Sequence, residues 1–285
     1  MFDSLRNWPT GELRSLPRDF LRSFLVSAPK GTFDNVRTFC VFLGHSRSGH
    51  SILAALLDAH RNIVLADEIR SLKHVAAGFS SMMIYKLILQ NSIDISSEKR
   101  ERAGYEFEVP NQWQGKYESI HVIGDKDGSW TATLALRNFR MIEALFTRIP
   151  ADIRIIHLYR NPYDVISTIY RRHRAAGNPE PLQHAINYYF RRTTGVEMVR
   201  KYAGSSIVLD LSHEGLIAEP TAHLERTCEF LSVDAPPNYL SACAKAIFGS
   251  RKKSRHEITW NSSDIAQVSE RKAHYEYLAS YTFDD

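Results

Sequence analysis

Short apolar runs alternate with helix-like segments along most of this 285-residue chain. The runs are rich in β-branched and aromatic residues, and they lie at 38–43, 62–66, 119–124, 153–159 and 206–211. Between them, apolar residues recur at the three- and four-residue spacing of helices that pack along one face. Strands that alternate with helices in this way form a parallel sheet covered on both faces. The pattern predicts an α/β fold of three layers, with about five parallel strands in the central sheet.

Helix-like spacing occurs before, between and after the expected strands. The helical ranges are 18–26, 72–90, 133–147, 182–201 and 221–231, and another helix is expected to begin at Pro162. Proline is favoured at that position because a first-turn residue needs no N–H partner. No clear linker divides the chain, and its length suits one α/β domain. We therefore expect a single domain over 1–285, with residues 1–35 as an N-terminal helical extension.

The first apolar run breaks at Gly44, crosses a polar loop, and is followed by a helix-like segment from Ile52 to Leu57. In such a turn, unpaired N–H groups at the helix start point into the loop, and the helix dipole adds partial positive charge. The loop Gly44–Ser51 is therefore suited to an anion, with phosphate as the first candidate. The simpler alternative is that Gly44 and Gly49 only form a tight turn.

This loop approaches the Walker A motif, which has Gly, four residues, Gly, Lys and then Ser or Thr. Gly44, Gly49 and Ser51 match the motif, but His50 stands at the lysine position. In kinases and ATPases that lysine reaches the β- and γ-phosphates, and a neutral imidazole would replace it poorly. The cation in this loop is Arg47. The chain thus departs from the kinase pattern at its central residue.

A second candidate anion site follows the run at 153–159. Arg160 stands at the tip of this expected strand, and Thr168 and Arg172 share one face of the helix after it. A guanidinium fork and a hydroxyl supply charge-assisted hydrogen bonds that suit a phosphate monoester. The alternative for the arginines of this helix is a solvated face.

Charge and cysteine content narrow the classes of function. The 36 basic and 32 acidic residues leave a formal charge of +4, too small to indicate binding to nucleic acid or to an anionic membrane. Cys40, Cys228 and Cys243 are typical of buried thiols in a reducing compartment, and the scattered histidines offer no ligand-like pair. The chain begins without a basic-then-apolar signal, and no apolar stretch approaches the ~20 residues of a membrane span. We expect a cytoplasmic protein with no metal site and no membrane anchor.

Four motifs in order along the chain resemble those of the sulfotransferases that use 3′-phosphoadenosine 5′-phosphosulfate (PAPS). They are Gly44–Ser51, Glu68, Gly124–Lys126, and Arg160–Asp164 with Thr168. The resemblance is nearest to the tyrosylprotein sulfotransferases and their bacterial relatives, whose loop carries Arg before Ser-Gly. It implies a P-loop-type fold and transfer of a sulfuryl group from PAPS to a hydroxyl of an acceptor.

The resemblance also implies which residues bind PAPS. Those implied for the 5′-phosphosulfate are Ser46, Arg47, Ser48, Gly49, His50 and Ser51. Those implied for the 3′-phosphate are Arg160, Thr168 and Arg172, and Ser254 falls near a serine that contacts the nucleotide in the relatives. His50 replaces a threonine that is common in the relatives, and nothing in the sequence explains this exchange.

Sulfuryl transfer needs a base for the acceptor proton and cations around the sulfuryl oxygens and the leaving phosphate. Glu68 matches the acidic base position of the tyrosylprotein enzymes, and Arg47 and Lys126 are the candidate cations. The phenol and steroid enzymes carry a histidine two residues after a lysine like Lys126, where this chain has Gly128. Their histidine route is thus absent here, which favours Glu68 as the general base.

Structural roles are the alternative for both charges. Glu68 can form an ion pair with a nearby arginine, Arg70 or Arg47, and Lys126 can brace its loop through the aspartate on either side. Other functions also remain open. A kinase-like phosphotransferase is one, since 207–210 can pass for a Walker B strand, and a non-catalytic nucleotide-binding module is another.

The acceptor is not defined by the sequence. The hydroxyl of a small molecule, a carbohydrate, a lipid or a tyrosine is compatible with the motifs. The resemblance fades in 72–118 and in 235–285, and we expect these two segments to build the acceptor pocket and to cover the bound nucleotide.

Overall fold

The computed structural model describes residues 13–97, 101–102, 105–178, 180–247 and 252–285. Its central sheet has the strand order β2-β5-β1-β6-β7, and each neighbouring pair is parallel. The strands are β1 (Thr38–Gly44), β2 (Ile63–Asp67), β5 (Val122–Lys126), β6 (Asp152–Tyr159) and β7 (Val208–Ser212). The five-stranded parallel sheet expected from the apolar runs is confirmed.

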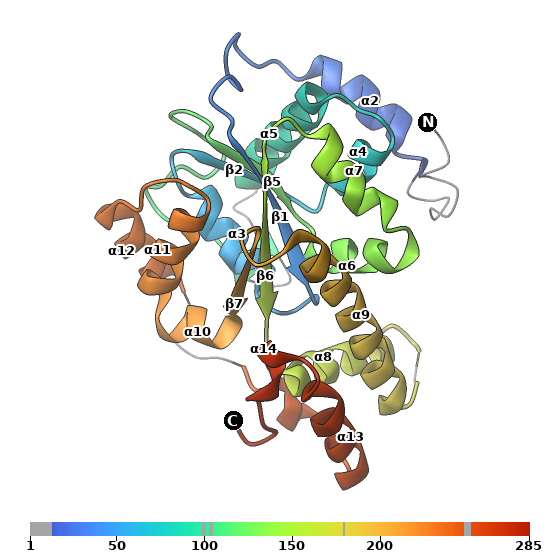
Figure 1. The fold of residues 1–285 in the computed structure, drawn as a ribbon. Helices are drawn as coiled ribbons and strands as arrows, with labels where there is room; N and C mark the ends of the chain where they lie inside the picture. The colour runs from blue at the N-terminus through green and yellow to red at the C-terminus, as the bar shows by residue number, and fades with distance from the viewer. Residues whose placement is uncertain (1–12, 98–100, 103–104, 179, 248–251) are drawn as a thin grey trace.

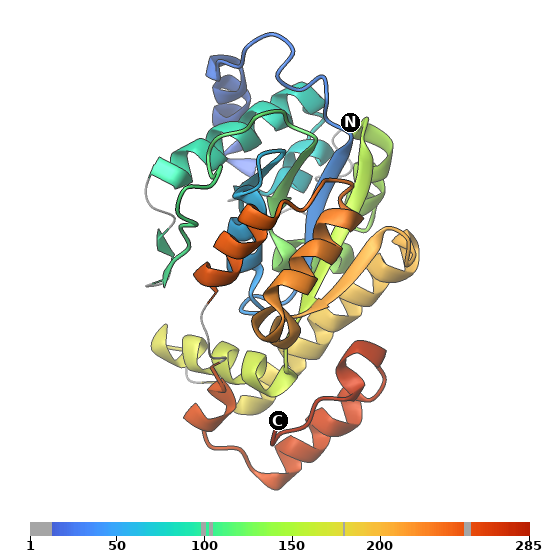
Figure 2. The ribbon, with the colours of Figure 1, turned by 90° about the vertical axis from the view of Figure 1, so that its left-hand side faces the viewer.

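Helices cover both faces of this sheet, which makes the fold three-layered (Figures 1 and 2). On β1, Phe39, Val41 and Leu43 enter one hydrophobic cluster, whereas Cys40 and Phe42 enter a second cluster on the opposite face. The first face is covered by α4 (Ser71–Ala76), α5 (Ser81–Ser97), α6 (Gly128–Arg137), α7 (Arg140–Arg148) and α9 (Leu182–Ala203). The second face is covered by α3 (His50–Asp58), α10 (His213–Ala218), α11 (Pro220–Phe230) and α12 (Pro237–Ala246).

The remaining elements lie around this three-layer body. Helix α2 (Leu16–Leu25) packs against α5, and β3 (Glu101–Arg102) pairs with β4 (Tyr105–Glu106) in a small antiparallel sheet. At the lower end of Figure 1, a third hydrophobic cluster joins α8 and α9 to the C-terminal elements. The elements of that end are α8 (Pro162–Ala175), the 3₁₀ turn η2 (Ser254–Glu257), α13 (Ser262–Lys272) and α14 (Glu276–Ala279). Within the described residues, no helix combines the length and apolarity needed to cross a membrane.

Two segments that the sequence predicts as single helices are each divided in the structure. The 72–90 segment breaks between α4 and α5, where Gly78 has a φ of +83° that suits glycine. The 133–147 segment spans the junction of α6 and α7 at Asn138, whose φ of −157° is extended rather than helical. Apolar spacing continues across both breaks, which is why the pattern does not reveal them.

Candidate active site

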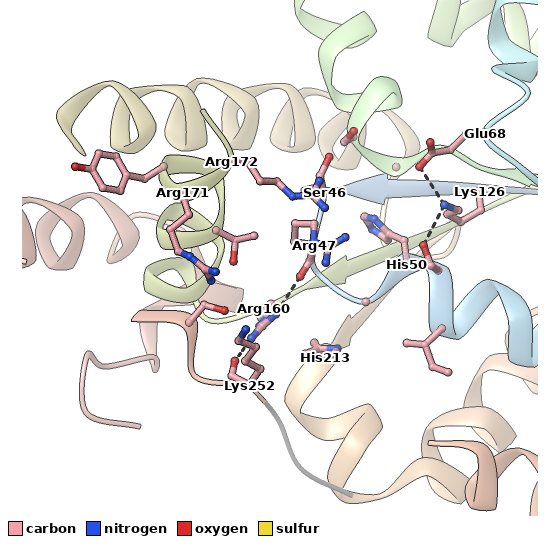
Figure 3. A pocket seen from close by; sticks show the side chains of 18 of the residues that line it. Ser46, Arg47, His50, Glu68, Lys126, Arg160, Arg171, Arg172, His213 and Lys252 are labelled. Atoms are coloured by element: carbon pink, nitrogen blue, oxygen red, sulfur yellow. Dashed lines mark hydrogen bonds and ion pairs between the residues drawn. The ribbon is translucent and has the colours of Figure 1, made fainter. Parts of the chain in front are cut away.

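A cavity of about 1110 Å³ lies at the carboxyl edge of the sheet (Figure 3). In parallel sheets, ligands bind at this edge because the loops and helix N-termini after the strands meet there. The residues singled out in the sequence that line the cavity are Ser46, Arg47, Gly49, His50, Ser51, Glu68, Lys126, Arg160, Thr168, Arg172 and Ser254. Residues that are far apart in the chain thus meet at one site.

The Gly44–Ser51 loop runs from β1 to α3 through left-handed backbone conformations. The φ angle is +135° at Gly44, +74° at Arg47 and +94° at Gly49. Helix α3 begins at His50, directly after Gly49, so its first N–H groups have no carbonyl partner within the helix. Together with the Arg47 guanidinium, these N–H groups make this end of the cavity, the loop end, suited to an anion.

Ser48 is the one residue of the predicted set that does not line the cavity. Its side chain is buried, and its hydroxyl has no hydrogen-bond partner within the described residues. Since the Ser48 side chain does not reach the cavity, a contact from Ser48 to a ligand would have to come from its backbone.

In the same loop, the His45 ring stacks on Tyr189 with centroids 4.0 Å apart and donates from Nε2 to Thr193 Oγ1 at 3.1 Å.

At the loop end, Lys126 joins Glu68 to the start of α3. Lys126 Nζ lies 3.0 Å from Glu68 Oε1 and 3.2 Å from Ser51 Oγ, and it also forms an ion pair with Asp67. The Lys126 side chain is 3% exposed and that of Glu68 is 42% exposed, so the ammonium is enclosed while the carboxylate meets solvent in the cavity. The ion partners of Lys126 are thus the acidic pair at the end of β2, Asp67 and Glu68, whereas the sequence offered the flanking aspartates.

Strained backbone is concentrated around this ion pair. Glu68 and Arg70 have φ angles of +59° and +62°, and Arg47 has +74°. Outside the cavity, among the described residues, only Asn111 and Ser232 combine a side chain with a positive φ. Each such residue costs about 1–2 kcal/mol, and strain of this kind clusters at functional sites. The backbone therefore supports a functional role for the loop end that does not depend on the motifs.

The other end of the cavity is basic. The Arg160 guanidinium donates to Arg47 O at 3.2 Å and to Lys252 O, so it links the loop to the C-terminal segment. Thr168 and Arg172 follow on α8, one turn apart, and both line the cavity. We call the group of Arg160, Thr168, Arg172, Lys252 and Ser254 the basic end. It brings residues of the stretch 160–172 together with residues of the C-terminal segment.

The structure adds residues that the sequence analysis did not single out. Arg171, Lys252 and His213 line the cavity, and Glu257 pairs with Arg171 and, at 2.7 Å, with Lys252. Lys252 belongs to a basic run in the sequence, and Arg171 precedes Arg172 on the helix for whose arginines a solvated face was the alternative. Nothing in the sequence points to His213, because this residue follows β7 and approaches the Gly44–Ser51 loop only in the folded chain. A Cβ on Gly49 would lie 2.4 Å from His213 Nδ1.

Apolar and acidic groups form the wall beside Glu68. Trp130 lines it, and the Arg70 guanidinium lies 4.9 Å from the centroid of a Trp130 ring. Asp127 caps α6 by accepting from Trp130 N at 3.4 Å. Burial and neighbouring carboxylates raise the pKa of Asp127 to about 7. The charge of this wall therefore changes near neutral pH.

His50 fills the space between the loop and the start of α6. Its ring is buried and donates from Nε2 to Leu43 O at 3.2 Å. Burial, with Lys126 nearby, lowers the pKa of His50 to about 3, so the ring is neutral at pH 7. A neutral ring does not replace the charge of a Walker A lysine. It occupies instead the volume that a side chain at Gly128 would need, because a Cβ there would lie 2.7 Å from His50 Cε1.

We expect Gly128→Ala to destabilise the protein by about 1–3 kcal/mol, because the new methyl group overlaps a ring that is already fixed. The His50→Ala change should remove most of this clash, so the double variant should lose less stability than the sum of the single variants. Urea unfolding of the wild type, both single variants and the double variant measures the coupling. Additive losses would contradict the assignment of His50 as the residue that restricts position 128.

The arrangement by itself defines a class of protein. It is an α/β protein of P-loop type whose cavity, at the carboxyl edge, has a loop suited to an anion at one end and a cluster of cations at the other. A model described as the sulfotransferase family matches residues 40–237, which is more than half of the chain. The chain belongs to the sulfotransferase family. No curated protein sequence matches it.

Several solved structures are similar to this chain to different degrees. Sulfotransferase STF9 from Mycobacterium avium is 13% identical with a TM-score of 0.50, and the match covers 93% of this chain and 80% of that one. The sulfotransferase domain of the Synechococcus PCC 7002 olefin synthase is 18% identical over 86% and 96% of the two chains, with a TM-score of 0.49. Mouse SULT7A1, solved in complex with 3′-phosphoadenosine 5′-phosphate (PAP), is 14% identical with a TM-score of 0.44, and the match covers 87% of this chain and 73% of that one. The likeness to STF9, at 13% identity, concerns the fold alone.

Proposed function

We propose that this protein transfers the sulfuryl group of PAPS to a hydroxyl of an acceptor. The observation that carries the proposal is the presence of cations at both ends of one cavity, joined by the hydrogen bond from Arg160 to Arg47 O. PAPS carries a phosphosulfate on its 5′ side and a phosphate on its 3′ side, and it needs both ends. A nucleotide with phosphates on the 5′ side alone would leave the cations of the basic end without a ligand.

The loop end is the proposed site of the phosphosulfate. Arg47 and the N–H groups from Ser46 to Ser51 supply positive charge on the side of the loop, and Lys126 supplies it from β5. Arg160, Thr168 and Arg172 are the proposed ligands of the 3′-phosphate. The list of proposed nucleotide contacts also includes Ser48 through its backbone, Ser254, and two residues found only in the structure, Arg171 and Lys252.

Glu68 is the proposed general base. PAPS supplies an activated sulfuryl group, whose bond to the 5′-phosphate breaks during transfer. Glu68 takes the acceptor proton while the acceptor oxygen forms its bond to sulfur, and the 5′-phosphate leaves with the electron pair of the broken bond. Lys126 and Arg47 offset the negative charge on the sulfuryl oxygens and on the leaving phosphate. The products are a sulfate ester and 3′-phosphoadenosine 5′-phosphate (PAP).

A kinase-like activity has weaker support. A P-loop kinase uses a loop lysine and an aspartate from a neighbouring strand that holds Mg²⁺. Position 50 holds a neutral histidine, and Asp210, the candidate aspartate, accepts hydrogen bonds from Arg200 Nη2 and His157 Nδ1, both at 2.6 Å. Among the described residues, no cluster of His, Cys, Asp or Glu is arranged to hold a metal ion.

The segments at 72–118 and 235–285 are the proposed acceptor-pocket and nucleotide-covering parts of a single domain. Phe107 from the first segment lines the cavity and packs against the hydrophobic cluster that includes α3. Lys252, Ser254 and Glu257 from the second line the basic end. The C-terminal segment is therefore the better supported of the two, since it borders the proposed 3′-phosphate site directly. The acceptor classes are the hydroxyls of small molecules, carbohydrates, lipids and tyrosine.

Equilibrium titration with PAP, adenosine 5′-phosphate and ATP with Mg²⁺ tests the nucleotide assignment. We expect PAP to bind most tightly, because only PAP carries the 3′-phosphate. Arg172→Ala should weaken PAP binding by about 10- to 100-fold, the loss of one charge-assisted hydrogen bond of 1.5–3 kcal/mol. The same variant should leave the affinity for adenosine 5′-phosphate unchanged.

Arg191→Ala is the matched control, since Arg191 is an exposed arginine on α9 that does not line the cavity. It should leave PAP affinity unchanged. Tight binding of ATP with Mg²⁺ but not of PAP would contradict the proposal and favour the kinase alternative. Tight binding of PAP without any sulfated product would favour a non-catalytic nucleotide-binding module.

A further inference from the structure

Helix α2 presents an apolar surface that the cavity does not use. Its side chains Phe20, Leu21, Phe24 and Leu25 are exposed to 45%, 64%, 64% and 83%. We call these four side chains the α2 stripe. Scattered single apolar residues are normal on protein surfaces, but large ones that gather on one helix mark an interaction site.

Polar contacts fix α2 to the domain from its other side. Asp19 pairs with Lys73 Nζ at 3.2 Å and with His74 Nε2 at 3.1 Å, and Lys73 Nζ donates to Ser15 Oγ at 2.6 Å. The Lys73 and His74 side chains are only 5% and 2% exposed. Leu16, on the inward side, packs against the main hydrophobic cluster. These contacts hold α2 on the domain, and most of the α2 stripe takes no part in them and faces away from the domain.

Exposed cations border the α2 stripe. The cations Arg14, Arg18, Arg22 and Lys30 are all exposed. Arg22 forms an ion pair with Asp94 of α5. Within residues 13–30 the one acidic residue is Asp19, which pairs with Lys73 of α4 and also lies 3.6 Å from the guanidinium of Arg18. Although the whole chain carries a formal charge of only +4, this segment combines apolar side chains with a locally positive surface.

We propose that α2 docks on a membrane surface that contains anionic lipids. In this arrangement the α2 stripe enters the boundary between headgroups and acyl chains, and the arginines contact the anionic headgroups. Phenylalanine and leucine on one face with arginine at its border are typical of helices that lie in the plane of a membrane surface. This inference does not depend on the proposed function.

A second copy of the chain fits the α2 stripe less well. A two-fold contact through α2 would bring the same patch, with its exposed cations, to both sides of one interface and so raise the positive charge there. An anionic lipid surface offers the opposite charge. Charge complementarity therefore favours lipid over self-association.

The position of α2 is compatible with docking. In both ribbon views α2 lies at the end of the molecule opposite α8, whose residues line the basic end (Figures 1 and 2). A protein bound to a membrane through α2 would hold α8, and with it the basic end of the cavity, at the end of the molecule far from the lipid. Soluble nucleotides would then reach it freely.

Co-sedimentation of the full chain with vesicles tests the proposal. We expect binding to vesicles of phosphatidylcholine with phosphatidylglycerol (3:1), weaker binding to phosphatidylcholine alone, and loss of binding as salt screens the charges. The variant Leu21→Ser/Phe24→Ser/Leu25→Ser should reduce the bound fraction at least tenfold on both vesicles. Arg14→Gln/Arg18→Gln should reduce it only on the anionic vesicles.

Thermal unfolding and circular dichroism of each variant check that the fold is retained, independently of any activity. Absence of binding to anionic vesicles, or equal binding by the serine variant, would overturn the proposal. If only a chain that lacks residues 1–12 bound the vesicles, the proposal would be overturned, and residues 1–12 would be the partner of the α2 stripe in the full chain. A dimer seen by sedimentation equilibrium that the serine variant abolishes, without vesicle binding, would assign it to a second copy.

Discussion

Replacing Glu68 by Gln is expected to lower the rate of sulfuryl transfer by about 10²- to 10⁴-fold, the usual contribution of a general base. Glutamine keeps the length and shape of the side chain but takes up no proton. The affinity for PAP should stay nearly unchanged, because Glu68 is not among the proposed ligands of the nucleotide. The measurement is the rate at which ³⁵S from labelled PAPS enters acceptors in a whole-cell extract, with PAP titration in parallel.

Asp67→Asn is the matched control for this prediction. Asp67 and Glu68 are adjacent carboxylates that both pair with Lys126, so each orients the ammonium. If Glu68 acts only by holding Lys126, the two variants should lose similar activity. If Glu68 is the base, Asp67→Asn should retain much more activity than Glu68→Gln. Equal losses, or a Glu68→Gln protein within a few-fold of the wild type, would remove Glu68 from the proposed mechanism.

Asp164→Asn is expected to lower the free energy of unfolding by about 3–5 kcal/mol, the usual cost of removing one partner of a buried ion pair. Asp164 accepts from Arg255 Nε at 3.1 Å, Nη2 at 2.9 Å and backbone N at 2.9 Å. Both side chains are at most 3% exposed, so the variant leaves a buried guanidinium without its countercharge. Urea unfolding measures the loss.

The same variant should also weaken PAP binding. Arg255 follows Ser254 and anchors the C-terminal segment to α8, and its Nη1 donates to Thr282 O and Phe283 O at 3.0 Å. Loosening this segment displaces Lys252, whose carbonyl oxygen holds Arg160. As a control, Asp94→Asn breaks the exposed pair with Arg22 and should cost no more than about 1 kcal/mol. Equal effects of the two variants would contradict the anchoring role of Asp164.

Much of the fold follows from local sequence. The continuous apolar runs predict strands, and the glycines of the Gly44–Ser51 loop predict the turn into α3, because these signals involve residues that are neighbours in the chain. Parallel strands with helical connections have their carboxyl ends at one edge of the sheet. Placing Arg47, Glu68, Lys126 and Arg160 at that edge therefore required no knowledge of which strands are neighbours.

The helix breaks near Gly78 and Asn138 were not predicted, because the apolar spacing continues across them. The sequence also did not predict that Lys126 pairs with the acidic residues at the end of β2. This pairing depends on the strand order β2-β5-β1, in which the ends of β2 and β5 are adjacent although 58 positions separate Glu68 from Lys126. The sequence offered flanking aspartates and arginines as alternatives, and only the strand order distinguishes among them.

His50 and Gly128 illustrate the same limit. In the sequence they are two unrelated departures from relatives, one in the loop and one after Lys126. In the structure they are a single packing arrangement, since the buried ring of His50 occupies the volume at Gly128. The sequence by itself determined the elements and the edge at which they place chemical groups, because periodicity and turn formation are local. The tertiary structure decided which groups touch, because contacts between distant segments depend on how the sheet and its helices pack.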